Sequence, residues 1–244
     1  MDRALDVLLA FTAEDRELTA SDLVKRVDLS RPTLYRLVHT LKRKQFLVAS
    51  GDPQRFRLGP AVARLAHAWT ASINLSALAE PMMRKVWEET AETVALFVRD
   101  GAFRLCVAEM PSPQVLNFKR GVGYRERLAL GASGRAILAY ARDAADRLET
   151  YARDVELDPK TLRQQLAPVR NRGFAISKDE LIQGAVAIAA PFFDGSDLVT
   201  GSIGVFGPSA RIGSLQIEAF GKLVVREARQ LSSALGHTRK TPER

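Results

Sequence analysis

The chain has 244 residues, enough for one large domain or two of ordinary size, and 46% of them are hydrophobic, so it can bury a sizeable core. No run of about 18 apolar residues occurs, so no membrane span is expected. Cys106 is the only cysteine and the three histidines are far apart in sequence, which excludes an intramolecular disulfide and argues against a metal site. We therefore expect a cytoplasmic protein that needs no metal or other cofactor.

The net charge of +8 is concentrated near the N-terminus. Residues 25–64 contain ten bases and two acids, so this window alone carries +8 and the rest of the chain sums to zero. A basic excess confined to one small region is typical of a nucleic-acid-binding surface. A merely solvated surface would instead spread the excess along the chain.

Residues 1–59 predict a winged helix-turn-helix domain, which is mostly helical and ends in a β-hairpin wing. Apolar residues at helical spacing indicate a first helix over residues 3–13. A second helix begins near Thr19, a natural N-cap with Asp22 three residues later, as in a capping box. After a third helix, two short strand-like runs flank the turn GDPQ and form the predicted wing: residues 46–50 and 55–58.

The third helix begins after Ser30, which can serve as its N-cap, and its apolar positions repeat at the spacing of one buried face. The opposite face is polar and cationic. No acid occurs between Leu29 and Ser50, whereas a solvated helix usually mixes charges of both signs. Such side chains can reach base edges and phosphates, so we predict that this helix binds double-stranded DNA. The candidate DNA-contacting residues are Ser30, Arg31, Thr33, Tyr35, Arg36, His39 and Arg43 in the helix, and Arg55 and Arg57 in the wing.

A single winged helix offers too small an interface for tight specific binding. We therefore expect a dimer that binds a palindromic operator, with half-sites separated by the dimer geometry. Residues 60–76 predict a linker helix, and one of its faces is expected to supply part of the dimer contact through Val62, Leu65, Ala66 and Trp69.

Residues 77–236 predict a second domain of a different character. Two strand-like runs are joined at RDG, a turn GASG leads into a helix, and another helix ends at Gly173. Two buried-looking strands follow, and then a long helix. Antiparallel strand pairs with helices before, between and after them indicate an α+β domain. Residues 237–244 are expected to form a flexible basic tail.

Over nearly its whole length the chain resembles the IclR family of bacterial transcriptional regulators. The matching stretches of the first domain are ALDVLLAF, LTASDLVKRVDLSRPTLYRLVHTLKRKQFL and RFRLGPAVARLA. Those of the second domain, which are more specific, are GASGRAILA, RNRGFAISKDELIQGAVAIAAPFFD and GSIGVFG. The resemblance implies a GAF-like effector-binding domain with an antiparallel sheet, and homodimers or homotetramers that repress or activate nearby catabolic genes.

The resemblance also implies that the effector lies beside the GASGR turn, where helix N-terminal amides attract a carboxylate. The alternative interpretation of this turn is tight packing by small residues. The implied effector-binding residues are Glu126, Ala132, Ser133, Gly134, Ser177, Ala185, Ala187, Gly204 and Phe206.

Two of these positions depart from the family pattern. Ser177 stands where an acidic residue is typical, and Glu126 stands where an apolar residue is usual. Fewer polar groups and the ring of Phe206 favour a larger or aromatic organic acid over a very small, highly polar one. Glu126 either binds a hydroxyl or amine of the ligand or points to solvent.

Two alternative classes of function are an enzyme and a protein-interaction module. An enzyme with an accessory basic domain would need a nucleophile beside a base, but the chain has no G-x-S-x-G motif and no histidine between His67 and His237. A winged-helix protein-interaction module would use the same basic residues to bind an acidic partner. The sequence favours a DNA-binding regulator and predicts no catalytic residue.

Overall fold

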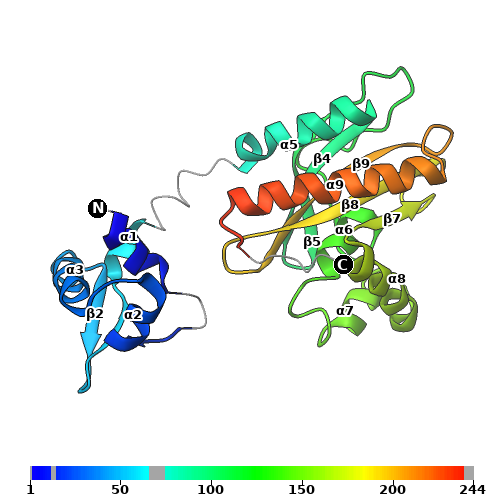
Figure 1. The fold of residues 1–244 in the computed structure, drawn as a ribbon. Helices are drawn as coiled ribbons and strands as arrows, with labels where there is room; N and C mark the ends of the chain where they lie inside the picture. Colours follow the sequence, from blue (N-terminus) through cyan, green and yellow to red (C-terminus); the bar gives the residue numbers. More distant parts are fainter. Residues whose placement is uncertain (1, 12–14, 66–74, 239–244) are drawn as a thin grey trace. The chain divides into compact units, whose positions relative to one another are not determined.

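The computed structural model describes residues 2–11, 15–65 and 75–238. The chain divides into two compact units, residues 1–73 and residues 74–244 (Figure 1). No helix within the described ranges is long and apolar enough to cross a membrane.

The first unit is a winged helix-turn-helix, as the sequence predicts. Its elements are α1 (Asp2–Leu9), β1 (Leu18–Thr19), α2 (Ala20–Val27), α3 (Arg31–Arg43), β2 (Leu47–Ser50) and β3 (Arg55–Leu58). The strands form an antiparallel sheet in the order β1-β3-β2, and the two-residue strand β1 was not expected. One apolar cluster holds the unit together, and its buried members are Val7, Leu18, Leu23, Leu34, Val38, Leu41, Leu47 and Phe56.

The ends of α2 and α3 follow from short-range chemistry. The amide of Asp22 donates to Thr19 Oγ1 at 3.2 Å and the amide of Thr19 donates to Asp22 Oδ2 at 3.0 Å, so the predicted capping box is present. Helix α2 ends at Asp28, whose left-handed backbone (φ 43°) turns the chain toward α3. Ser30 is the N-cap residue of α3, but its hydroxyl bonds the hydroxyl of Thr33 at 2.9 Å instead of a backbone amide. The first turn of α3 therefore lacks the predicted side-chain cap.

The connector begins beside the wing. The amide of Ala61 donates to the carbonyl of Gln45, and Ala61 is buried. Val62 and Leu65 lie in the described part of this segment, and Leu65 is exposed. Ala66 and Trp69 lie outside the described residues.

The second unit is an α+β domain built on a six-stranded antiparallel sheet in the order β6-β5-β4-β9-β8-β7. Its strands are β4 (Thr93–Asp100), β5 (Phe103–Met110), β6 (Arg125–Arg127), β7 (Ala175–Lys178), β8 (Ala185–Phe193) and β9 (Val199–Pro208). Its helices are α5 (Leu75–Thr90), α6 (Gly131–Leu138), α7 (Leu148–Arg153), α8 (Pro159–Arg172) and α9 (Ser214–Ala234).

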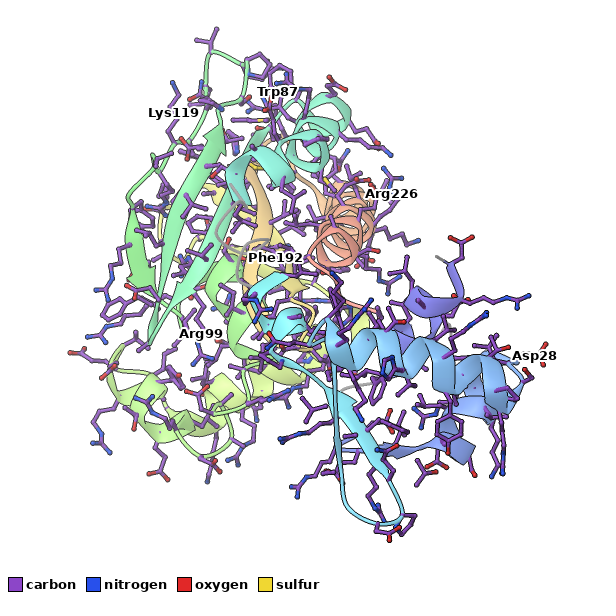
Figure 2. All side chains as sticks on the ribbon, turned by 90° about the vertical axis from the view of Figure 1, so that its left-hand side faces the viewer. Asp28, Trp87, Arg99, Lys119, Phe192 and Arg226 are labelled. Carbon is purple, nitrogen blue, oxygen red and sulfur yellow. The ribbon has the colours of Figure 1, made fainter. Side chains whose placement is uncertain are left out.

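Helices α5 and α9 pack against each other over one face of this sheet (Figure 1). Phe192 of β8 is fully buried, whereas Arg226 projects from α9 and pairs with Glu89 and Glu227 (Figure 2). At the C-terminal end, the ring of His237 stacks on Phe193, and residues 239–244 lie outside the described residues.

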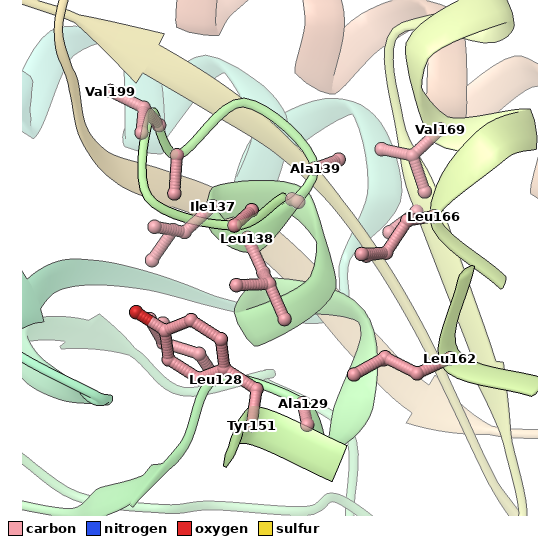
Figure 3. Packing of buried hydrophobic residues seen from close by; sticks show 14 of the residues in the cluster. Leu128, Ala129, Ile137, Leu138, Ala139, Tyr151, Leu162, Leu166, Val169 and Val199 are labelled. Atoms are coloured by element: carbon pink, nitrogen blue, oxygen red, sulfur yellow. The ribbon is translucent and has the colours of Figure 1, made fainter. Parts of the chain in front are cut away.

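Helix α6 is buried along its whole length beside β8 and β9. Leu138 packs among side chains from α7 and α8, including Leu162 and Leu166 (Figure 3). The short helix α7 was not expected, whereas α8 ends as predicted at Gly173, which adopts a left-handed conformation (φ 85°). Helix α6 is therefore held by packing on all sides, and its first turn lies against the sheet.

Candidate functional site

Helix α3 separates its two faces cleanly. Leu34, Val38 and Leu41 are buried in the first unit, and Tyr35 on the opposite side is 49% exposed. Among the candidate DNA-contacting residues of the helix, Thr33 is half-buried. The other six are exposed: Ser30, Arg31, Tyr35, Arg36, His39 and Arg43. The helix therefore presents a continuous basic face to solvent.

The wing also has one buried face and one exposed face, and its residues alternate between them as in any strand. Phe56 of β3 is fully buried, and its neighbours Arg55 and Arg57 are exposed because successive side chains point to opposite faces. The wing thus displays two arginines beside a helix of the same charge.

The basic groups of this unit are not equally free. Arg26 pairs with Asp15 and also donates to the carbonyl of Ala10, so it has a structural role. Within the described ranges, Arg36, Arg43, Arg55 and Arg57 have no carboxylate partner. Unpaired, exposed guanidinium groups are available for phosphates or base edges.

The second unit contains a cavity between the sheet and the first turn of α6. Its wall is formed by Phe97, Arg104, Phe118, Arg120, Tyr124, Gly131, Ala132, Ser133, Ser177, Glu180, Leu181, Ile182, Ala185, Ala187 and Phe206. Six of the nine predicted effector-binding residues are in this wall: Ala132, Ser133, Ser177, Ala185, Ala187 and Phe206. Strand register explains part of this arrangement, since Ser177 pairs with Ala187 and Ala187 pairs with Phe206 across β7, β8 and β9.

Two predicted glycines lie behind the wall instead of in it. A Cβ atom on Gly204 would come within 2.8 Å of Ser133 Oγ, and one on Gly134 would overlap the carbonyl oxygen of Leu128. Ser202 Oγ also donates to the carbonyl of Ser133 at 3.1 Å. These close contacts let α6 approach the sheet and so fix the first turn of the helix.

Glu126 does not line the cavity either. Its carboxylate accepts the hydroxyl of Tyr124 at 2.9 Å and the amide of Arg127 at 2.8 Å. Glu126 is half-buried, and it orients a tyrosine that does line the cavity. Its contact with the site is therefore indirect.

Glu180 is an acidic residue of the cavity wall and is not among the predicted site residues. Both of its oxygens accept hydrogen bonds from Arg135 at 2.7 Å, and Oε1 also accepts the amide of Gly131 at 2.9 Å. Burial tends to raise the pKa of Glu180, but the hydrogen bonds and charge of Arg135, together with that amide, lower the pKa below its ordinary value. The carboxylate is thus ionised and paired, and it occupies the first free amide of α6.

Arg104 is the functional candidate that the sequence analysis missed. It lies on β5, is 3% exposed, and its Nη1 donates to the carbonyls of Arg127 and Leu130 at 2.8 and 2.7 Å. Burial lowers the pKa of its guanidinium to about 10, so it remains charged at neutral pH. The alternation of side chains along the strand could have indicated its burial, because Arg104 and Cys106 are two residues apart and share the inward face of β5. Cys106 itself is buried, and burial raises the pKa of its thiol to about 11.

Aromatic rings supply much of the remaining wall. Phe97, Phe118 and Tyr124 join the predicted Phe206, and the guanidinium of Arg120 lies 4.8 Å from the centre of the Tyr124 ring. Phe118 and Arg120 come from the segment between β5 and β6, which has no helical or strand periodicity from which a site could be predicted. The cavity therefore combines apolar rings with two arginines and a neutralised carboxylate.

Comparisons with known proteins agree with this division into two units. The family described as bacterial transcriptional regulator IclR C-terminal matches residues 67–233, and the IclR helix-turn-helix domain matches residues 1–51. BhcR, an HTH-type transcriptional regulator from Paracoccus denitrificans, is 29% identical over 100% of this chain and 90% of its own length. The transcriptional repressor IclR of Escherichia coli is 23% identical over 98% of this chain and 90% of the repressor.

Solved structures show the same architecture. The crystal structure of an IclR transcriptional regulator from Silicibacter sp. TM1040 has a TM-score of 0.81 at 25% identity, covering 97% of this chain and 96% of that one. Pseudomonas aeruginosa HmgR shares the fold with a TM-score of 0.76 at 20% identity, covering 97% of each chain. The matched relatives are transcriptional regulators and not enzymes, so neither alternative function is favoured. The chain belongs to the IclR family of bacterial transcriptional regulators.

Proposed function

We propose that this regulator binds a palindromic operator as a dimer, with α3 in the major groove and the wing near the phosphate backbone. The observation that carries this proposal is the division of α3 into a buried apolar face and an exposed face whose Arg36 and Arg43 have no carboxylate partner among the described residues. Arg36 and Tyr35 contact base edges, and Arg55 and Arg57 lie near phosphates. Ser30, Arg31, Thr33, His39 and Arg43 complete the proposed interface.

The dimer requirement follows from interface size. One winged helix buries about 600–1,000 Å² on DNA, which is small for tight specific binding. Two copies related by a twofold axis read two half-sites and give operator symmetry. A dimer of dimers extends the same principle to a longer operator.

The regulatory ligand in this proposal is a small organic acid that binds in the cavity of the second unit. Its carboxylate lies at the first turn of α6, near Ala132, Ser133 and Gly134, where helix amides lack intrahelical partners. Its body lies against Phe206, Ala185 and Ala187. The ring of Phe206 and the neighbouring aromatic wall favour an acid that carries a ring.

DNA binding is tested by measuring affinity for random duplex DNA over a range of salt concentrations. The logarithm of the affinity is expected to fall linearly with the logarithm of salt, with a slope of about −0.9 for each phosphate contact. A protein-interaction module would bind DNA weakly and show no such slope. Replacing Arg55 and Arg57 with Gln should make the slope shallower.

Ligand binding is tested with a thermal-shift series of aromatic and aliphatic acids, because a ligand that binds only the folded state raises the melting temperature. Acids that raise it are then added to the operator complex. The proposal expects the same acids to change operator affinity. Acids that stabilise the protein but leave both operator affinity and promoter activity unchanged would contradict a regulatory role for the cavity.

A further inference from the structure

The cavity wall contains a buried cation that forms no hydrogen bond with a carboxylate among the residues that the structure describes. Arg104 is 3% exposed, yet its two hydrogen-bond acceptors are backbone carbonyls, those of Arg127 and Leu130. Its Nε is buried and has no partner among the residues that the structure describes. A buried charge without a counter-ion is costly unless a ligand supplies one.

The acids near Arg104 are already engaged elsewhere. Glu180 forms a bidentate pair with Arg135 and accepts the amide of Gly131. Glu126 accepts the hydroxyl of Tyr124 and the amide of Arg127. Both carboxylates attract the Arg104 guanidinium electrostatically, but neither hydrogen-bonds to it, so its Nε–H remains available to donate to an anion.

The position of the Arg104 guanidinium beside α6 is a second observation that favours binding of an anion. A Cβ atom added to Gly131 would lie 3.2 Å from Arg104 Nη2, so this nitrogen is next to the first residue of the helix. The two carbonyl contacts of Nη1 hold the group in place before any ligand arrives. A fixed guanidinium beside a helix N-terminus is a preorganised site for a carboxylate.

We propose that Arg104 is the counter-ion of the effector and that the cavity selects aromatic monocarboxylates. The carboxylate binds Arg104 at the start of α6, and the ring lies among Phe97, Phe118, Tyr124 and Phe206. This inference rests on the proposed function of the cavity as the effector site. It adds to that function the residue that recognises the charge of the ligand.

The first arm of the experiment uses calorimetry with the wild-type protein and matched pairs of ligands. Benzoate, phenylacetate and 4-hydroxybenzoate are compared with their uncharged amides. Because hydrogen bonds to charged groups are the strong ones, at least one acid is expected to bind on the order of 10- to 100-fold more tightly than its amide. Equal affinity for acids and amides, or failure of every acid to bind, would overturn the inference.

The second arm assigns the effect to one residue. Arg104→Gln is expected to remove the preference for the acid while retaining weak binding of the amide, and Arg104→Lys is expected to keep part of that preference. Arg120→Gln tests the other arginine of the cavity wall, which is more exposed and lies beside the Tyr124 ring, and it is expected to keep the preference for the acid. Loss of that preference in Arg120→Gln but not in Arg104→Gln would overturn the proposal. Equal losses for acid and amide in Arg104→Gln would make Arg104 merely structural.

A spectroscopic measurement covers the case in which Arg104→Gln does not fold. The Nε–H resonance of Arg104 in the wild-type protein, assigned with Arg104→Lys, is expected to shift when benzoate is added. An unchanged resonance at saturating benzoate would overturn the proposal. Operator binding is measured separately, so failure of the charge-recognition model is distinguishable from failure of the proposed regulator function.

Discussion

The arginines of the first unit differ in whether another residue of the protein already forms a salt bridge with them. Arg26 is held by Asp15, whereas Arg36 on the exposed face of α3 has no acidic partner among the described residues. The first is therefore expected to affect stability and the second to affect DNA binding. This distinction depends on contacts between residues that are distant in sequence, so charge counting alone does not provide it.

Replacing Arg36 with Ala should weaken binding to the cognate operator by on the order of 1–3 kcal/mol if the guanidinium reads a guanine. Preference at one base pair of each half-site should relax at the same time. Competition binding against single-base operator variants measures both effects. A loss that is uniform across all sequences would instead identify Arg36 as a phosphate contact.

Residues of the cavity were predictable to different degrees. Ser177, Ala187 and Phe206 follow from the family resemblance, and their adjacent places in the strand register bring them together. Arg104 and Glu180 did not follow, because their roles depend on burial and on which neighbour satisfies each charge. Only the folded chain shows that Glu180 forms a salt bridge with Arg135. It also shows that Arg104 has no hydrogen-bonded carboxylate among the described residues.

A second prediction at this scale concerns Ser177. Ser177→Asp places another negative charge in the cavity wall and should weaken binding of an aromatic acid by about tenfold or more through like-charge repulsion. Ser177→Asn is the uncharged control of similar size. Calorimetry with benzoate compares the two variants, and operator affinity without ligand should remain near that of the wild type. Matching benzoate affinities in the two variants would remove Ser177 from the site.

At the scale of elements, predictability followed the strength of the repeating pattern. Helix α3 has one buried face and was predictable from its apolar spacing, whereas α6 is buried on all sides and shows no such spacing. The strand β1 has two residues and exists because β3 offers a free edge, which no local pattern records. Short elements that depend on tertiary pairing are the ones that sequence patterns miss.

The capping box at α2 makes an element-scale prediction. Thr19→Ala removes the side-chain acceptor of the Asp22 amide and should lower the free energy of unfolding by about 1 kcal/mol. Ser30→Ala is the matched control at the N-cap of α3, where the hydroxyl caps no amide, and its effect should be smaller. Urea denaturation of the two variants gives the comparison. Equal destabilisation would mean that the capping hydrogen bond contributes little.

At the scale of the whole molecule, the candidate DNA-binding surface and the cavity lie in different units. The basic window of residues 25–64, with ten bases and two acids, belongs to the first unit, and the cavity with its buried arginine belongs to the second. This division was predictable from composition and from the family resemblance. If the effector acts through operator affinity, its binding in the second unit must change the DNA affinity of the first, which is a coupling free energy between two sites.

The oligomeric state is the prediction that belongs to this scale. Sedimentation at micromolar concentration should detect a dimer or a dimer of dimers, both with and without operator DNA. Footprints on the operator should show two symmetric half-sites. A monomer under both conditions, or a single asymmetric footprint, would contradict the proposed mode of DNA binding.

The turn between α2 and α3 bears on how the protein searches a genome. Asp28 provides the left-handed turn, yet its carboxylate is exposed next to α3, the helix proposed to bind DNA (Figure 2). It also lies at the C-terminal end of α2, where the helix dipole disfavours a negative charge. Asn adopts the same backbone conformation without the charge. Asp28→Asn should therefore strengthen attraction to every stretch of duplex alike. Stronger non-specific affinity lengthens the time that a regulator spends on each non-operator site, so we expect the negative charge of Asp28 to shorten that time.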